Sequence, residues 1–216
     1  MKNNLKVLIP GGTGFIGFHL CLFFIKKGWK VYSISKSKPK KNRKVNGVKY
    51  IFCDVSDKNK LRKKLADHYD YVINVSGYVD HSKKRSIMRS HYQGCKNLVD
   101  ILKKKKLKKF IQIGSSIEYG KKKSPHKETN VKKFNTLSFY GNAKLASTLF
   151  LLSAFKKESF PVSILRLYLV FGPYQDDNRV IPYVINNSLD GKSFACSPGN
   201  QLRDFLYIED VVNAIY

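Results

Sequence analysis

Three glycines, Gly11, Gly14 and Gly17, constrain the fold of this chain more than any other feature. They follow an apolar segment that ends at Ile9 and open a segment with helical periodicity, the context in which this spacing binds a dinucleotide. Gly11 permits a tight turn, Gly14 lets the backbone approach a pyrophosphate, and Gly17 lets the helix pack on the strand. An ordinary glycine-rich turn is the alternative. With the N–H groups of the helix N-terminus, the predicted cofactor contacts are Gly11, Gly14, Phe15, Ile16 and Gly17.

Apolar, β-branched segments alternate with helical patterns along the chain, which predicts strands buried on both faces and connected by helices. This alternation is typical of an α/β protein with a Rossmann-type doubly wound parallel sheet and helices on both faces. Asp57 is the expected N-cap of the second helix. The expected strands span residues 6–9, 31–34, 48–53, 71–75, 110–113 and 162–170, and the expected helices 15–27, 58–67, 86–106 and 140–157.

Proline, glycine and asparagine become frequent after Gly172, which predicts a change of domain. We expect a dinucleotide-binding domain over residues 1–172 and a partial substrate-binding region over 173–216, interleaved with the first. Residues 207–216 read as a strand end entering a helix whose apolar pattern is still running at Tyr216. The sequence therefore predicts an incomplete C-terminal substrate-binding lobe, truncated at its C-terminus.

The net charge of +26 raises nucleic acid or an anionic membrane as possible partners. The basic residues are mostly lysines in short runs, such as 103–106 and 121–123, without interleaved aromatic residues. A solvated lysine-rich surface is favoured over a nucleic-acid interface, and its positive field would help an anionic sugar nucleotide to approach.

The four cysteines, Cys21, Cys53, Cys95 and Cys196, lie too far apart for a metal motif and are expected to be free thiols. Residues 1–10 leave no room for a cleavable leader. The apolar stretch 15–25 is shorter than the ~20 residues that a membrane span requires. A soluble cytoplasmic protein with no membrane partner is the prediction.

The cofactor's adenosine end is expected to meet the residues that follow the second and third strands. An acidic residue at the end of the second strand would bind a ribose diol, but Ser35 stands there, followed by Lys36. A lysine can pair with a 2′-phosphate, so the sequence leans towards NADP(H) over NAD(H). Asp54 and Val55, after the third strand, are expected beside the adenine edge.

Tyr140 and Lys144 are four residues apart at the start of a predicted helix and therefore share one face. An ammonium beside a phenol favours phenolate, the form that a general base needs. Ser115 ends the fifth predicted strand, where ligands bind in open α/β sheets. It could hydrogen-bond the substrate oxygen whose proton Tyr140 exchanges, while Lys144 also reaches the nicotinamide ribose. Ser115 could instead cap a turn, and Ser116 is a rival for its position.

These motifs together resemble the extended short-chain dehydrogenase/reductases, the NAD-dependent epimerase/dehydratase family of nucleotide-sugar enzymes. The resemblance covers essentially the whole chain and implies a catalytic triad of Ser115, Tyr140 and Lys144, with Arg203 on the nucleotide diphosphate and Ser116 near the substrate. It implies hydride transfer through a keto sugar, giving an epimer or a reduced sugar, and a homodimer built from two helices per subunit. The motifs are GGTGFIG at 11–17, CDV at 53–55, SSIEYG at 115–120, YGNAK at 140–144, LRLYLVFGP at 165–173 and RDFLYIED at 203–210.

The chain departs from the family pattern at four positions. Ile117 stands where the 4,6-dehydratases carry an acid that eliminates water, and Glu118 is one residue out of register. On a strand extension, Glu118 would face the other way. Leu169 and His91 replace asparagines that are common beside the substrate. Epimerase or NADPH-dependent 4-keto reductase is therefore favoured over dehydratase, and a catalytically weak dinucleotide-binding scaffold is the alternative from another class.

Overall fold

The computed structural model describes residues 5–65, 68–78, 83–103, 106–130, 136 and 138–216. They form two compact units, Met1–Leu167 and Tyr168–Tyr216. The predicted division at residue 172 falls inside the second unit.

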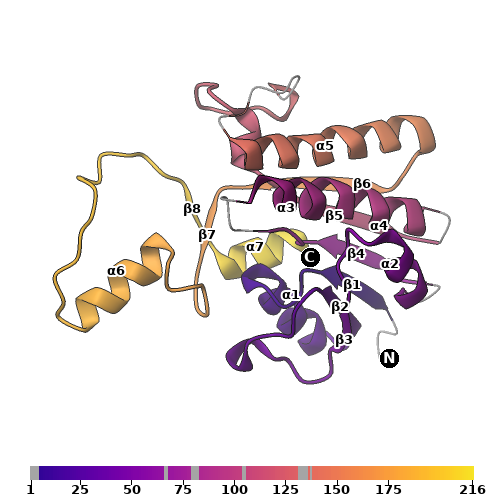
Figure 1. The fold of residues 1–216 in the computed structure, drawn as a ribbon, viewed down its shortest axis with the longest axis horizontal. Helices are drawn as coiled ribbons and strands as arrows, with labels where there is room; N and C mark the ends of the chain where they lie inside the picture. Colours follow the sequence, from indigo (N-terminus) through magenta and orange to yellow (C-terminus); the bar gives the residue numbers. More distant parts are fainter. Residues whose placement is uncertain (1–4, 66–67, 79–82, 104–105, 131–135, 137) are drawn as a thin grey trace. The chain divides into compact units, whose positions relative to one another are not determined.

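The first unit is built on a six-stranded sheet in the order β3-β2-β1-β4-β5-β6, with every neighbouring pair parallel (Figure 1). This is the strand order of the Rossmann fold, and the order reverses between β1 and β4, where such sheets bind ligands. The predicted doubly wound parallel sheet is confirmed. The strands are β1 Lys6–Pro10, β2 Lys30–Ser35, β3 Lys49–Phe52, β4 Tyr71–Asn74, β5 Lys109–Ser115 and β6 Val162–Leu167.

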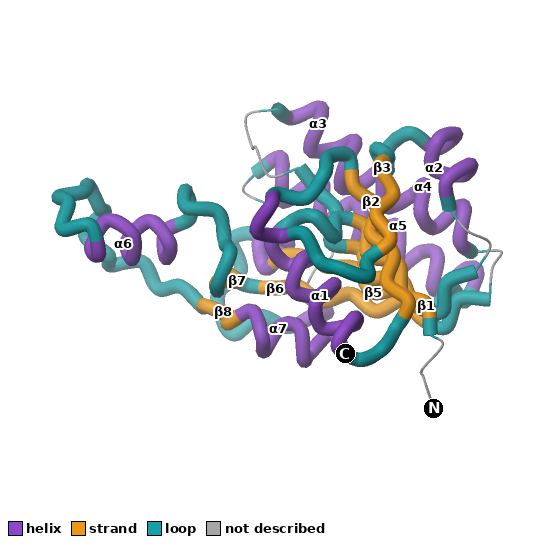
Figure 2. Tube along the Cα trace, turned by 90° about the horizontal axis from the view of Figure 1, so that it is seen from below, coloured by secondary structure: helices purple, strands orange, loops and turns teal. Residues whose placement is uncertain are grey.

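Helices cover both faces of this sheet, with α1 on one side and α2, α4 and α5 on the other (Figure 2). Side chains alternate along β1: Leu8 joins a buried cluster with Leu61, Leu98 and Leu151 from α2, α4 and α5, while its neighbours point to the opposite face. The side chain of Asp57 caps α2 by accepting from Lys60 N at 3.1 Å, as predicted. The helices are α1 Phe15–Lys26, α2 Lys58–Lys64, α3 Lys84–Met88, α4 Gly94–Leu102 and α5 Phe139–Glu158, with 3₁₀ turns at Lys41–Arg43, Ser116–Tyr119 and Glu128–Asn130.

Three expectations about these elements were wrong. The helix predicted over 86–106 starts earlier and is α3 and α4 joined by a π-helical turn at Arg89–Gln93. The strand predicted over 162–170 divides, because β6 ends at Leu167 and the next strand belongs to another sheet. The edge strands β3 and β6 are only partly buried, since an edge has a neighbour on one side alone.

The second unit contains β7 Leu169–Phe171, α6 Val180–Leu189, β8 Phe205–Tyr207 and α7 Ile208–Ile215. β7 and β8 pair in parallel as a two-stranded sheet. The predicted strand end followed by a helix near residue 207 is confirmed by β8 and α7. Among the described residues, no helix has the length and apolar character to cross a membrane.

Candidate functional site

The glycine loop joins β1 to α1 in a conformation that requires its glycines. Gly11 has a φ of +87°, and a Cβ there would lie 2.8 Å from the backbone of Ser76, which follows β4. A Cβ on Gly17 would overlap the carbonyl oxygen of Gly11. Gly14 is exposed at the N-cap of α1, next to Phe15. The loop therefore keeps backbone close together at the point where the strand order reverses.

The first turn of α1 suits an anionic group. Its N-cap residue, Gly14, makes no side-chain capping hydrogen bond, and the first turn contains no acidic residue among the described positions. The Gly14 N–H donates to the carbonyl oxygen of Gly11 at 3.0 Å, which leaves the N–H groups of Phe15 and Ile16 and the positive end of the helix dipole at the start of α1. A dinucleotide pyrophosphate fits this arrangement chemically.

Ser35 ends β2 beside the loop. It is 8% exposed, and its Oγ accepts from the N–H of Thr13 at 3.4 Å. The side chain therefore already supports the loop, a contact that sequence spacing did not indicate.

Lys36 and Asp54 lie together at the ends of β2 and β3. Lys36 Nζ is 3.9 Å from Asp54 Oδ2, and the lysine side chain is 78% exposed. Burial raises the pKa of Asp54, but hydrogen bonds from Ser56 and the charge of Lys36 outweigh it and hold the pKa below its usual value. Val55 is buried, and its carbonyl accepts from Asn97 Nδ2 at 3.0 Å. Any 2′-phosphate near Lys36 would thus meet a carboxylate as well as an ammonium.

Ser115 is the last residue of β5 and caps the 3₁₀ turn at Ser116–Tyr119. Its Oγ accepts from the N–H of Ile117 at 3.4 Å. A hydroxyl that accepts from the backbone still has its O–H to donate, so capping and a substrate contact are compatible. Ser116 and Ile117 are partly exposed on the same turn.

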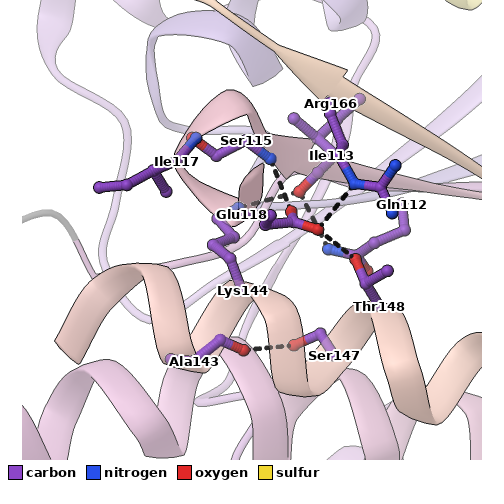
Figure 3. Close-up of polar contacts among 10 residues, drawn as sticks. All are labelled: Gln112, Ile113, Ser115, Ile117, Glu118, Ala143, Lys144, Ser147, Thr148 and Arg166. Carbon is purple, nitrogen blue, oxygen red and sulfur yellow. Dashed lines mark hydrogen bonds and ion pairs between the residues drawn. The ribbon is translucent and has the colours of Figure 1, made fainter. Parts of the chain in front are cut away.

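The expectation that Glu118 sits on a strand extension was wrong. The chain turns after Ser115, and Glu118 is the third residue of the 3₁₀ turn. Its side chain is fully buried and accepts from Ser115 N at 2.8 Å and from Arg166 Nε at 3.0 Å (Figure 3). It faces away from solvent because it completes a capping box, not because strand residues alternate.

Tyr140 and Lys144 occupy the first turns of α5, whose N-cap is Ser138. The Lys144 Nζ lies 5.9 Å from the centroid of the Tyr140 ring. It donates to the carbonyl oxygen of Ile113 at 2.9 Å, two residues before Ser115. This hydrogen bond ties the start of α5 to the carboxyl end of β5.

His91 packs against Tyr140 from the π-helical turn. The ring centroids are 5.1 Å apart and the planes are at 82°, an edge-to-face contact. His91 is 5% exposed, its Nε2 is 3.2 Å from the carbonyl oxygen of Tyr78, and its own carbonyl accepts from Ser147 of α5 at 3.1 Å. The residue that departs from the family pattern thus touches the proposed catalytic tyrosine.

Arg203 and Leu169 belong to the second unit. Arg203 is exposed just before β8, and its Nη1 donates to the carbonyl oxygen of Leu202 at 3.0 Å. Leu169 begins β7, is 45% exposed, and donates its N–H to the carbonyl oxygen of Asp204 at 3.1 Å. The pairing of β7 with β8 brings these two motifs together.

Thr148 and Arg166, which hold Glu118 in place, were not among the residues expected from the sequence. A signal was present: Arg166 interrupts an apolar strand, and a buried cation requires a partner. Thr148 lies four residues after Lys144, on the same helix face.

A sheet of this order, with a glycine loop at its switch point, defines the Rossmann fold, the fold class in which dinucleotide-binding proteins are found. The chain belongs to the NAD dependent epimerase/dehydratase family, whose model matches residues 7–216.

Curated relatives include a dTDP-D-glucose 4,6-dehydratase from Dictyostelium discoideum, 30% identical over 97% of this chain, and a UDP-N-acetyl-alpha-D-glucosaminuronate decarboxylase from Bacillus cytotoxicus, 29% identical over 97%. The chain spans 54% of the first relative and 69% of the second.

Among solved structures, the UDP-glucuronic acid 4-epimerase from Bacillus cereus, in complex with UDP-glucuronic acid and NAD, superposes with a TM-score of 0.84. It is 27% identical, and the match covers 98% of this chain and 72% of that one. A UDP-N-acetylglucosamine 4-epimerase from Methanobrevibacter ruminantium is 29% identical with a TM-score of 0.84, covering 99% and 72% of the two chains. The chain is thus similar to epimerases and to dehydratases alike.

Proposed function

We propose that this protein is an NAD(P)-dependent epimerase of nucleotide-diphosphate sugars that works through a keto-sugar intermediate. One observation carries the proposal. The Tyr140/Lys144 pair begins α5, and Lys144 Nζ is hydrogen-bonded at 2.9 Å to the β5 carbonyl two residues before Ser115. Ser115, Tyr140 and Lys144 therefore belong to two segments joined directly at the ligand-binding end of the sheet.

Each of the three side chains has a separate task in this proposal. Tyr140, as phenolate, takes the proton from a sugar hydroxyl, and Ser115 donates a hydrogen bond to the same oxygen. The ammonium of Lys144, 5.9 Å from the centroid of the Tyr140 ring, would attract the negative charge that develops on the tyrosine oxygen during proton transfer. A bound nicotinamide cofactor would supply reversible hydride acceptance. Epimerisation requires the keto sugar to present its opposite face before the hydride returns to the carbon and Tyr140 returns the proton to the oxygen.

The remaining contacts are assigned by the same proposal. Arg203, a forked cation, is suited to the substrate diphosphate, and Ser116 to a neighbouring sugar hydroxyl. The glycine loop with Phe15 and Ile16 is suited to the cofactor pyrophosphate. At the adenosine end we propose a slight preference for NADP(H), because Lys36 is exposed enough to contact a 2′-phosphate. The carboxylate of Asp54, 3.9 Å from Lys36 Nζ, also interacts with this ammonium.

An NADPH-dependent 4-keto reductase is the second candidate, favoured by the same Lys36 and by Ile117, which cannot move a proton in a dehydration.

A homodimer is also proposed, because Leu152 and Phe155 of α5 are 39% and 56% exposed. Exposed apolar surface of this kind is typical of a subunit interface. A cytoplasmic location stays a prediction.

The test begins with binding. NAD, NADP and their reduced forms are titrated by fluorescence, and UDP-, dTDP-, GDP- and CDP-hexoses are then assayed by chromatography. An epimerase converts sugar without net consumption of cofactor, whereas a reductase consumes NADPH in proportion to product. Tyr140→Phe should retain cofactor binding and lose turnover. Failure to bind any dinucleotide would sink the proposal, and dinucleotide binding without any turnover would leave the scaffold function.

A further inference from the structure

A single buried carboxylate connects the two segments that carry the proposed catalytic residues. Glu118 Oε1 accepts from the backbone N–H of Ser115 at 2.8 Å, and Oε2 accepts from Thr148 Oγ1 of α5 at 2.7 Å and from Arg166 Nε of β6 at 3.0 Å (Figure 3). The Glu118 side chain has no exposed surface. One side chain thus joins the end of β5, the helix α5 and the strand β6.

Such a carboxylate is costly to bury unless it is paired. Arg166 is 9% exposed and supplies the counter-charge. Its guanidinium also lies 5.2 Å from the centroid of the Tyr119 ring. Burial lowers the pKa of Arg166, but hydrogen bonding to Tyr119 and Glu118 outweighs this and raises the pKa above its usual value. Arg166 therefore stays charged.

Glu118 contacts both elements that carry the proposed catalytic residues, the end of β5 and the helix α5. Its bond to the Ser115 N–H holds the residue whose hydroxyl is proposed to meet the substrate. Its bond to Thr148 holds α5 one turn after Lys144 and two turns after Tyr140, on the same helix face. The bond from Lys144 to Ile113 is a second tie between the same two elements. Loss of Glu118 would therefore free Ser115 while leaving one tie to α5.

We propose that Glu118 is a positioning residue that keeps Ser115 in register with Tyr140 and Lys144. The proposal rests on the proposed function for its kinetic readout only. Displacement of a reacting group by about 1 Å can cost ~100-fold in rate, so a rigid anchor behind Ser115 matters more for turnover than for substrate binding.

Glutamine cannot replace Glu118 in this network. All of the contacts to the carboxylate come from donors, and a glutamine side chain offers one oxygen and one NH₂ group. With the oxygen towards Ser115, the NH₂ group meets Arg166; with the oxygen towards Arg166, it meets the Ser115 N–H. In either orientation of Glu118→Gln, the NH₂ group therefore faces another hydrogen-bond donor. The positive charge of Arg166 also loses its carboxylate partner.

A double variant separates positioning from stability. In Glu118→Met/Arg166→Met the buried ion pair becomes two apolar side chains of similar size, an exchange that is often neutral or stabilising. Asp70→Asn is the matched control, because the Asp70 carboxylate also accepts from a backbone N–H, that of Lys6 at 2.8 Å, but lies before β4 at the opposite end of the sheet.

The measurements are kcat, KM, cofactor Kd, Tm and amide hydrogen exchange. In the double variant we expect a folded protein with a modestly lower Tm, because the Ser115 N–H and the Thr148 hydroxyl lose their acceptor. We expect kcat to fall by about tenfold or more, with KM and cofactor Kd within about twofold of the parent. Asp70→Asn should lower Tm and leave kcat unchanged. A stable double variant with parental kcat would overturn the proposal, as would a kcat loss in Asp70→Asn matching that of the double variant.

Hydrogen exchange tests the anchor without turnover. The Ser115 amide should exchange faster in both Glu118 variants than in the parent and in Asp70→Asn, and parental protection at Ser115 would overturn the proposal. If the parent shows no turnover with any nucleotide sugar, the proposed function fails, while the exchange of the Ser115 amide still decides whether Glu118 holds that residue.

Discussion

The imidazole of His91 stands edge-on to the phenol of Tyr140, with ring centroids 5.1 Å apart. This contact arises because the π-helical turn places His91 over the glycine that follows Ser76: a Cβ on Gly77 would overlap the imidazole. Such turns are frequent at functional sites. A residue from the α3–α4 segment thereby restrains the ring that we propose as the acid/base.

We expect His91→Ala to lower both Tm and kcat, because the edge-to-face contact contributes about 0.5–1.5 kcal/mol beyond its buried area. His91→Phe keeps a ring edge beside Tyr140 and should retain more of both. Gly77→Ala should resemble His91→Ala, since the added methyl group displaces the imidazole. In thermal unfolding, the Gly77→Ala/His91→Ala double variant should lose less than the sum of the single changes; additive losses would contradict the coupling.

Two glycines of the loop are expected to have different roles: Gly17 is needed for folding and Gly14 for dinucleotide binding. Gly17→Ala should abolish cooperative unfolding or sharply lower Tm, because its Cβ overlaps the carbonyl oxygen of Gly11. A Cβ on Gly14 meets only that oxygen, at 3.3 Å, so Gly14→Ala should fold with little loss of stability. It should weaken dinucleotide binding by about tenfold or more, because the methyl group blocks close approach of a pyrophosphate. Unchanged affinity in a folded Gly14→Ala protein would argue against pyrophosphate binding there.

Cofactor preference should depend on the Lys36/Asp54 pair. Lys36→Ala should weaken NADPH relative to NADH by about threefold to tenfold, as expected for one exposed charge contact. Asp54→Asn should strengthen NADPH, since it removes a negative charge 3.9 Å from the lysine. Lys27→Ala, at the far end of α1, is the control and should change neither Kd. Equal effects on the two cofactors would contradict a 2′-phosphate contact at Lys36.

Thiol reactivity should distinguish one cysteine from the other three. All four are free, as predicted, but only Cys196 is exposed. Burial raises the pKa of Cys21 and of Cys95 to about 12, and it also raises the pKa of Cys53. The thiolate is the reactive form, so below these pKa values the buried thiols stay protonated.

Iodoacetamide at mildly alkaline pH should therefore modify Cys196 rapidly and the buried cysteines only as the protein unfolds, as followed by peptide mass spectrometry. Cys196→Ser should remove the fast phase. Fast labelling of Cys95 in the native protein would contradict this prediction, because it would show that the region around α4 exposes this buried thiol without global unfolding.

The sheet could be predicted because local patterns identify its elements. Each strand has an apolar run, Gly11, Gly14 and Gly17 mark the first turn, and Asp57 marks the start of α2. Right-handed crossovers then leave few ways to order parallel strands. Boundaries were less predictable: β6 ends at Leu167 although the apolar pattern continues, because hydrogen-bonding partners decide where a strand ends.

By itself, the sequence determined the α/β class, the glycine loop and the proposed positions of Ser115, Tyr140 and Lys144, since each depends on spacing within one or two neighbouring elements. Only the tertiary structure decided what surrounds them. From the sequence, Glu118 is an acidic residue one position out of register with the family motif. In the fold it is a buried ion-pair partner, because the side chains that donate to it lie 30 and 48 positions away in the chain. The contact between His91 and Tyr140 is likewise made by packing of two helical segments, which no local pattern records.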